Sequence, residues 1–166
     1  RTSNTYEPSI FLKWKMSRVR NMDIAFAYNT TVPDLVSTLG YRNTIDPLHI
    51  YMGNPLLRNS HSHTTTYNYH RMWLRKQIVL GFTASYNKDI NPQATLYSYD
   101  SATGVYTSKP MNVNGGDMWQ FALNYDQGIG FYFRLMNKFA LETAKSYGFL
   151  TIVDNNAADA QPELNK

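Results

Sequence analysis

The sequence lacks cysteine, lacks long apolar runs and is poor in charge. With no cysteine among its 166 residues, it has neither a disulfide framework nor a thiolate metal site. No run approaches the roughly 18 to 20 apolar residues of a membrane-spanning helix, which excludes a helical membrane protein. A spanning strand needs only about 9 to 11 residues, apolar at every second position, so strands stay possible. Charged residues make up 17% and mean hydropathy is −0.45, so Asn, Thr, Ser, Gln and Tyr must supply most of the polar surface.

The chain is rich in tyrosine, with 13 residues, and aromatic residues make up 14% of it. Tyrosine joins an apolar ring to a polar hydroxyl, which suits a membrane–water boundary, a sugar-binding face or a β-sandwich. The net charge is +4, but the basic residues do not gather on one predicted face. Arg18, Arg20, Arg75 and Lys76 fall at predicted turns. We therefore expect no nucleic-acid partner.

Apolar residues recur at every second position in several segments, which is typical of strands with one apolar side. The predicted strands are 9–17, 22–29, 62–70, 77–87, 117–125 and 129–140. The first two form a predicted hairpin whose apolar faces match across the pair. The fourth is the best membrane-strand candidate, because its apolar row Ile78, Leu80 and Phe82 continues to Tyr86, where an interface girdle would fall.

The last predicted strand is ambiguous. It follows a predicted turn at residues 126–128. Phe131, Leu135 and Phe139 are also spaced at helical intervals, and residues 141–145 have good helix propensity. The alternation favours a strand as far as Phe139.

Long connections separate the remaining segments. Residues 29–51 carry prolines and glycines, yet hold enough apolar side chains to pack, so we expect an ordered loop. A hairpin predicted at 94–100 and 105–113 is polar on both faces and is placed above the membrane. Short turns on one side and long loops on the other are typical of an up-and-down barrel. The predicted fold class is therefore all-β, with antiparallel up-and-down strands forming a segment of a transmembrane β-barrel that has short periplasmic turns and long outer loops.

Few residues suggest catalysis, so we expect no catalytic site, cofactor or metal, and no enzyme. His61 and His63 share one face of a strand, but no third ligand has matching spacing, and we interpret them as solvated or lumen-facing. No phosphate-binding loop or nucleophile elbow is present. Residues 114–116, Asn-Gly-Gly, are interpreted as a turn and nothing more.

Aromatic residues on the long-loop side are the candidate ligand contacts. They either stack on a ligand such as a sugar or pack the loops against each other, and the sequence leaves both open. The candidates are Tyr41, His49, Tyr51, Tyr97, Tyr99 and Tyr106.

The segment Asp-Pro followed by Gly-Asn-Pro-x-Leu, set between strands, resembles the barrel region of TonB-dependent outer-membrane receptors. It is most similar to the outer-membrane β-barrel family abundant in the Bacteroidetes. The resemblance covers roughly residues 9–153, and residues 99–104 and 109–115 resemble the outer hairpin of that family. The chain departs from the family at 58–60, Arg-Asn-Ser, where Lys-Pro-Glu is usual. The matching positions are Asp46, Pro47, Gly53, Asn54, Pro55 and Leu57.

The resemblance implies a function and a set of partners. Residues 1–153 would be a partial barrel of seven or eight strands, and 154–166 a loop or disordered tail. The plug domain and closing strand are absent from the sequence, so we expect either a piece of a longer chain in the outer membrane of a Gram-negative bacterium or a soluble excised segment that packs in another way, for instance by oligomerising. It would take part in binding and uptake of a glycan, peptide or metal complex. Its partners would be outer-membrane lipid, the rest of its barrel and plug, TonB and a surface lipoprotein.

The same interpretation assigns the two faces of the strands. The loops 29–59 and 88–116 would form the outer rim and contact cargo. The lipid-facing residues would be Ile78, Leu80, Phe82, Trp119, Phe121, Leu123, Phe131 and Phe133. The lumen-facing residues would be Asp23, Thr83, Asn87, Gln120, Asn124 and Arg134. The alternative is a soluble extracellular β-sandwich that binds carbohydrate or mediates adhesion, in which the apolar rows face an inner core.

Overall fold

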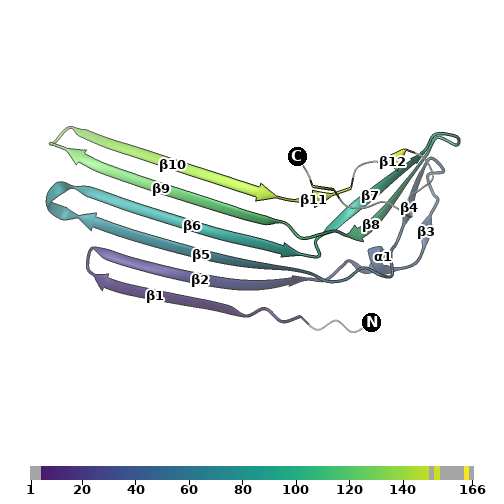
Figure 1. Cartoon of the computed structure of the whole chain (residues 1–166), viewed down its shortest axis with the longest axis horizontal. Coiled ribbons are helices and arrows are strands. Elements are labelled where there is room, and N and C mark those ends of the chain that lie inside the picture. Colours follow the sequence, from purple (N-terminus) through teal and green to yellow (C-terminus); the bar gives the residue numbers. More distant parts are fainter. Residues whose placement is uncertain (1–4, 150–151, 154–162, 165–166) are drawn as a thin grey trace.

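The computed structural model describes residues 5–149, 152–153 and 163–164. Its main feature is a long six-stranded sheet with the order β1-β2-β5-β6-β9-β10, in which every neighbouring pair is antiparallel (Figure 1). The strands are β1 (Ser9–Ser17), β2 (Arg20–Thr31), β5 (Ser60–Trp73), β6 (Ile78–Ile90), β9 (Asp117–Ile129) and β10 (Phe133–Lys145). Hairpin follows hairpin along the chain, which confirms the predicted up-and-down fold class.

The connections are short at one end of this sheet and long at the other. The short turns are residues 18–19, the segment 74–77 with the 3-10 helix η1 (Leu74–Lys76), and residues 130–132. Gln77 and Gly130 adopt positive φ values of 51° and 67°, which the tight turns require. The long connections, 32–59 and 91–116, lie together at the opposite end (Figure 1).

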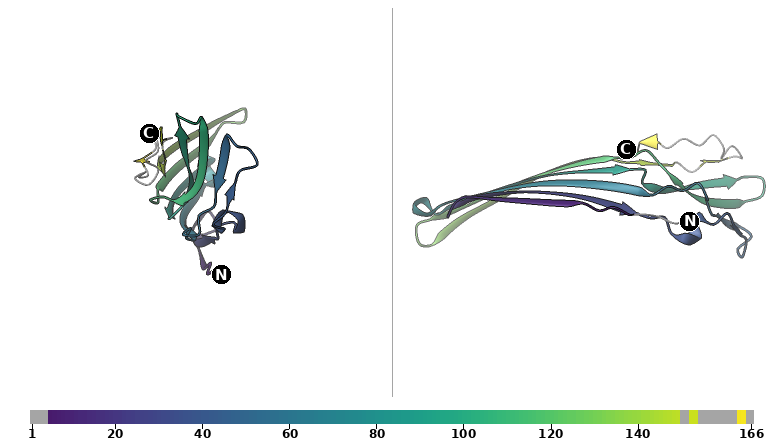
Figure 2. Two further views of the ribbon diagram at one scale, coloured as in Figure 1. Left: turned by 90° about the vertical axis from the view of Figure 1, so that its right-hand side faces the viewer. Right: turned by 90° about the horizontal axis from the view of Figure 1, so that it is seen from below.

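The long connections supply four strands of a second, five-stranded sheet beyond the ends of the long strands, and the chain after β10 supplies the fifth (Figures 1 and 2). The hairpin predicted to be polar on both faces forms β7 and β8, near the centre of this outer sheet. The long sheet therefore consists of the six other long strands. A short helix, α1 (Leu35–Thr38), lies in the first connection. The order of the outer sheet is β12 (Ile152–Val153), β7 (Gln93–Asp100), β8 (Val105–Asn112), β4 (His49–Met52) and β3 (Arg42–Asn43).

The residues predicted as a tail, 154–166, fall mainly outside the described residues. Within them, β13 (Glu163–Leu164) pairs with β11 (Tyr147–Gly148). In the described part of the chain, β1 and β10 form the two edges of the long sheet and do not pair with each other. Both edge strands therefore keep unpaired backbone groups along one side.

The predicted turn at 126–128 is wrong. These residues continue β9, and the chain reverses at Gly130, where positive φ costs a glycine little. Asp126 instead forms an ion pair across the hairpin with Arg134. The turn lies four residues later than predicted. β10 extends to Lys145, so the helical alternative for this segment is also wrong. β5 is longer than the predicted 62–70, and Arg20 begins β2 instead of lying in the turn.

Residues that lie directly opposite each other across the six strands form rungs, and the rungs alternate between two chemical characters. One rung contains Leu12, Ile24, Tyr67, Ala84, Phe121 and Leu141. The next contains Lys13, Asp23, Asn68, Thr83, Ala122 and Ala140. Because directly opposite side chains share a face, the sheet has one apolar and one polar face.

The residues predicted to face lipid and those predicted to face the lumen fall on opposite faces of the long sheet, as the register shows. Every residue predicted to face the lumen lies on the polar face, and the residues predicted to face lipid lie on the apolar face, except Phe131. Phe131 lies in the β9–β10 turn, off the strands, and is 99% exposed. The apolar face stays open: Leu12 and Phe139 are 60% and 65% exposed. No second sheet within the described residues covers it, so the β-sandwich alternative is wrong.

The apolar band crosses the sheet diagonally. Its boundary at the short-turn end lies at Met22 on β2 but at Phe133 on β10, six rungs nearer the turns. Six rungs are six residues, about 20 Å, over four strand spacings of about 4.8 Å each. The band therefore crosses the strands at about 45°, near the tilt of strands in a membrane barrel.

Candidate functional site

Asn54, in the Gly-Asn-Pro-x-Leu segment, joins three parts of the outer layer. Its side-chain Nδ2 donates to the Pro110 carbonyl at 2.9 Å, and its backbone N–H donates to the Ser37 carbonyl at 2.7 Å. Its Oδ1 accepts the Leu56 N–H at 3.1 Å. Asn54 is buried, so each of these groups replaces a bond to water that burial removed.

The residues around Asn54 explain the rest of the segment. A Cβ on Gly53 would lie 1.8 Å from the Leu39 carbonyl oxygen, so only glycine fits. Leu57 is 0% exposed, and Ile50, Leu96 and Val113 are also buried. The core of the described residues therefore lies in the outer layer, at the junction of the two long connections.

The first half of the matching motif shapes the chain before β4. Asp46 accepts the Leu48 N–H on its Oδ1 at 3.0 Å and the His49 N–H on its backbone carbonyl at 3.2 Å. Pro55 packs against Gly40, where an added Cβ would lie 3.1 Å from the proline Cγ. The motif as a whole therefore folds and anchors the first connection.

Asn112 makes a second tie, which sequence reasoning missed. Its Oδ1 accepts the Arg58 N–H at 2.8 Å, and its Nδ2 donates to the carbonyls of Arg58 at 3.1 Å and Asn91 at 2.8 Å. Arg58 and Asn112 are 54 residues apart, so no local pattern reveals their pairing. Asn54 and Asn112 together join the first connection to the hairpin of the second.

The outer sheet brings five of the six candidate aromatic residues onto one face. In its register, Tyr106 lies opposite both Tyr99 and His49, while Ser108 lies opposite both Tyr97 and Tyr51. The rings of Tyr99 and Tyr106 are 4.5 Å apart, centre to centre. Tyr97 and Tyr106 remain 45% and 47% exposed, so their rings are accessible to a ligand. We call this surface, made by Tyr97, Tyr99, Tyr106 and His49, the tyrosine face.

Tyr41 and Tyr51 have a packing role at the border of this surface. Tyr51 donates its hydroxyl to Ser37 Oγ at 3.0 Å, and its ring centre lies 6.1 Å from that of Tyr41. These two residues therefore hold the loop against β4. Ligand contact by any of the six stays a prediction.

Hydrogen bonds within the tip of the β7–β8 hairpin order it. Asp100 accepts the Thr103 hydroxyl at 2.7 Å and the Ala102 N–H at 3.0 Å. These two bonds, the Thr103 bond foremost, lower the pKa of Asp100 below its ordinary value because they stabilise the carboxylate. The tip therefore keeps its shape at neutral pH.

Hydrogen bonds between side chains cross the polar face of the long sheet from strand to strand. Asn68 on β5 donates to Asp23 at 2.8 Å and accepts the Thr83 hydroxyl at 2.9 Å. Farther along, Gln120 accepts from Ser85 at 3.2 Å and donates to Glu142 at 3.0 Å. Such a face suits contact with water inside a barrel.

His61 and His63 lie on the apolar face, so their interpretation as lumen-facing is wrong. The His61 ring stacks on Tyr28 at 5.5 Å, and His63 lies 6.3 Å from Tyr86, between centroids. Tyr86 in turn packs on Trp119 at 4.3 Å. The signal was present in the sequence, because His61 and His63 share the parity of Tyr67 and Tyr69. They belong to an aromatic belt where the apolar band ends toward the long connections.

Two further features surround these surfaces. Gly115 and Gly116 are more than a turn, because added Cβ atoms would lie 1.7 Å from the Asp89 carbonyl and 2.0 Å from that of Lys145. They allow the chain to pass between the ends of β6 and β10.

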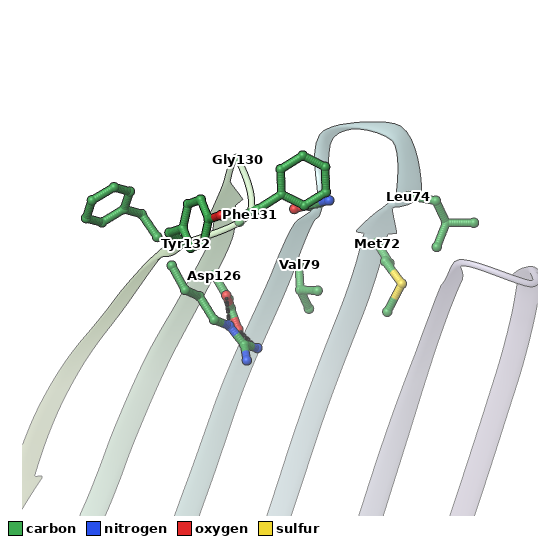
Figure 3. Close-up of a pocket in the computed structure, with 11 residues that line it drawn as sticks. Met72, Leu74, Val79, Asp126, Gly130, Phe131 and Tyr132 are labelled. Carbon is green, nitrogen blue, oxygen red and sulfur yellow. Dashed lines mark hydrogen bonds and ion pairs between the residues drawn. The ribbon is translucent and has the colours of Figure 1, made fainter.

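At the short-turn end, a hollow on the polar side of the long sheet is lined by Met72, Val79 and the turn residues Phe131 and Tyr132, beside the Asp126–Arg134 ion pair (Figure 3).

The described residues contain no group of three or more side chains suited to a metal ion. No helix among them has the length and apolar character to span a membrane. The model of the outer membrane protein beta-barrel family matches residues 2–162, nearly the whole chain. No curated protein matches the chain.

Proposed function

Since the chain belongs to the outer membrane protein beta-barrel family, we propose that it is part of a TonB-dependent receptor that binds a nutrient and takes it up. Membership places it in the outer membrane of a Gram-negative bacterium, with its apolar face against lipid. The short turns then lie toward the periplasm and the outer layer toward the outside. The uptake role draws on the resemblance of the Gly-Asn-Pro-x-Leu region to receptors of that class.

The tyrosine face is the observation that carries this proposal. It lies at the outer end of the strands, where a nutrient arrives, and it presents flat rings beside a histidine. Aromatic rings pack against the apolar faces of sugars and against peptide side chains at little cost in side-chain entropy. We therefore favour a glycan or peptide over a metal complex, because the exposed rings of Tyr97 and Tyr106 suit the apolar faces of sugars and peptide side chains.

The ties made by Asn54 and Asn112 support the same role. They hold β4 and β8 in place, and these strands carry His49 and Tyr106. A surface that is ordered before binding loses less entropy on binding. We propose further that the segment has no enzymatic activity, and that the plug, TonB and a surface lipoprotein act with it during uptake.

Glycan-array binding by the full protein in detergent tests the ligand contact. Tyr97→Ala with Tyr106→Ala should weaken binding of the captured oligosaccharide at least about tenfold, since a ring stacked on a ligand contributes about 1 kcal/mol or more in each case. Tyr132→Ala, an exposed tyrosine at the opposite end, is the matched control and should leave binding unchanged. Equal losses in both variants would contradict a site on the tyrosine face.

Uptake needs its own experiment. Cells expressing the full protein should accumulate the same oligosaccharide, and removal of TonB should abolish accumulation while leaving surface binding intact. Accumulation that continues without TonB would show a passive pore and overturn the energised transport, even if the tyrosine face binds its ligand.

A further inference from the structure

Basic residues gather at the short-turn end of the long sheet, in the turns and at the ends of the strands next to them. The β1–β2 and β5–β6 hairpins are adjacent there, since the Met72 N–H donates to the Val19 carbonyl at 2.8 Å. Arg18 lies in the first turn, and Arg75 and Lys76 lie in the second. Arg20 and Arg71 lie on the strands between these turns.

Arg20 and Arg71 are directly opposite each other in the β2–β5 register. Their Cβ atoms are therefore about 5 Å apart, on the same face. Two positive charges in this arrangement repel each other and destabilise the strand pair unless an anion lies between them. Both side chains are half-buried, so water screens them incompletely.

Within the described residues, no acidic side chain forms an ion pair with Arg20 or Arg71. The rung of this pair continues with Leu80, Tyr125 and Asn137. The nearest rungs on the same face, two residues away on either side, hold only apolar, aromatic and amide side chains on the described strands from β2 to β10: Met22, Tyr69, Phe82, Leu123, Phe139, Trp73, Ile78, Gln127 and Leu135. Among the described residues, Arg134 is the basic residue that forms an ion pair, with Asp126. This ion pair lies on the polar face, opposite the face of Arg20 and Arg71.

The surroundings of the pair are those of a membrane boundary. Arg20 and Arg71 follow directly on Met22 and Tyr69, where the apolar band ends on these strands. The Arg71 Cζ lies 4.3 Å from the centre of the Trp73 ring, which orients the guanidinium along the sheet surface. Tryptophan is enriched at the level of lipid headgroups.

We propose that Arg20 and Arg71 bind the phosphate of an anionic glycerophospholipid of the periplasmic leaflet. Guanidinium groups bind phosphate oxygens in pairs of hydrogen bonds, and one phosphate between the two would relieve their repulsion. The acyl chains would lie against Met22 and Tyr69 on the apolar face. The site depends on the membership in the outer-membrane family and is independent of the proposed nutrient uptake.

Native mass spectrometry of the full protein in a neutral detergent tests the site. Short-chain phosphatidylglycerol is the probe, and phosphatidylcholine and inorganic phosphate are the comparisons. Arg20→Gln with Arg71→Gln should weaken phosphatidylglycerol binding at least about tenfold. Arg75→Gln with Lys76→Gln removes the same charge from the same end and should change binding by less than about threefold.

Thermal unfolding of the single variant Arg20→Gln keeps the test decisive if the double variant fails to fold. In neutral detergent alone its Tm should rise, because the repulsion is gone; with phosphatidylglycerol added, its Tm should fall below that of the unaltered protein. A Tm that moves the same way in both conditions would overturn the proposal. Equal losses in the two double variants, or no preference for phosphatidylglycerol over phosphatidylcholine, would overturn it too. Inorganic phosphate that binds as well as the lipid would identify an anion site without lipid recognition.

Discussion

The side-chain amide of Asn54 donates a 2.9 Å hydrogen bond to the backbone carbonyl of Pro110, 56 residues farther along the chain. This bond joins the two long connections where the outer layer has its core. It gives the Gly-Asn-Pro-x-Leu segment a structural role: the segment holds the surface that carries the tyrosine face.

Replacing Asn54 with alanine should loosen the outer layer and leave the long sheet intact. The substitution leaves the buried Pro110 carbonyl without its hydrogen-bond donor. This should lower the local free energy of unfolding of the outer layer by about 1–3 kcal/mol. Hydrogen exchange should accelerate at residues 49–57 and 105–113 but not in β5 or β6. Asn43→Ala, which removes a local bond to Ile45 N–H, is the control and should have no such effect on 105–113. Unchanged exchange in Asn54→Ala would contradict the tie.

Gly53→Ala should disrupt the same layer more strongly. Its Cβ would lie 1.8 Å from the Leu39 carbonyl oxygen, which is backbone and has little freedom to move. Gly40→Ala, whose Cβ would come only within 3.1 Å of the Pro55 Cγ, should be milder. Limited proteolysis of the two variants compares the damage, and equal cleavage in both would contradict the assigned close approach.

Arginine substitutions at adjacent positions of β6 should show which face contacts lipid and which contacts water. Phe82→Arg would place a charge on the lipid side and should lower the free energy of unfolding in liposomes by about 2–4 kcal/mol. Thr83→Arg would place the same charge on the polar side, where water is present, and should cost much less. Urea titration in liposomes measures both. The sides would be wrong if Thr83→Arg were the more damaging change.

The order of the β7–β8 tip should depend on acid pH. The Thr103 hydroxyl lowers the pKa of Asp100, so the contribution of this bond is full above the ordinary Asp pKa and is lost as the pH falls through the lowered value. Thr103→Val should raise the pKa of Asp100 toward its ordinary value. An NMR titration of the carboxyl carbon measures it, and an unchanged pKa would show that the bond does not form in solution.

Some of the candidate site was predictable and some was not. The candidate tyrosines could be chosen from their type and their place in the long connections. That Tyr99, Tyr106 and His49 share a face depends on β4 pairing in parallel with β8, across more than 50 residues of chain. Asn112 was missed for the same reason, because its partner Arg58 carries no sign of the contact.

The position of the last turn shows a second limit. Asp126-Gln127-Gly128 has the composition of a turn, whereas Gly130 lies among Ile129, Phe131 and Tyr132, which give no turn signal. The Asp126–Arg134 ion pair and the register across β6, β9 and β10 select the later position. Local composition reveals neither the ion pair nor the strand register.

The sequence by itself determined which side of each long strand is apolar, because side chains alternate with a period of two and the alternation is written residue by residue. It also determined that the strands follow one another as hairpins with short turns at one end. Only the tertiary structure decided that Arg20 faces Arg71, that His61 and His63 join an aromatic belt, and that the two connections share one core. Those relationships arise from strand register and from contacts between distant segments, which no single stretch of the chain encodes.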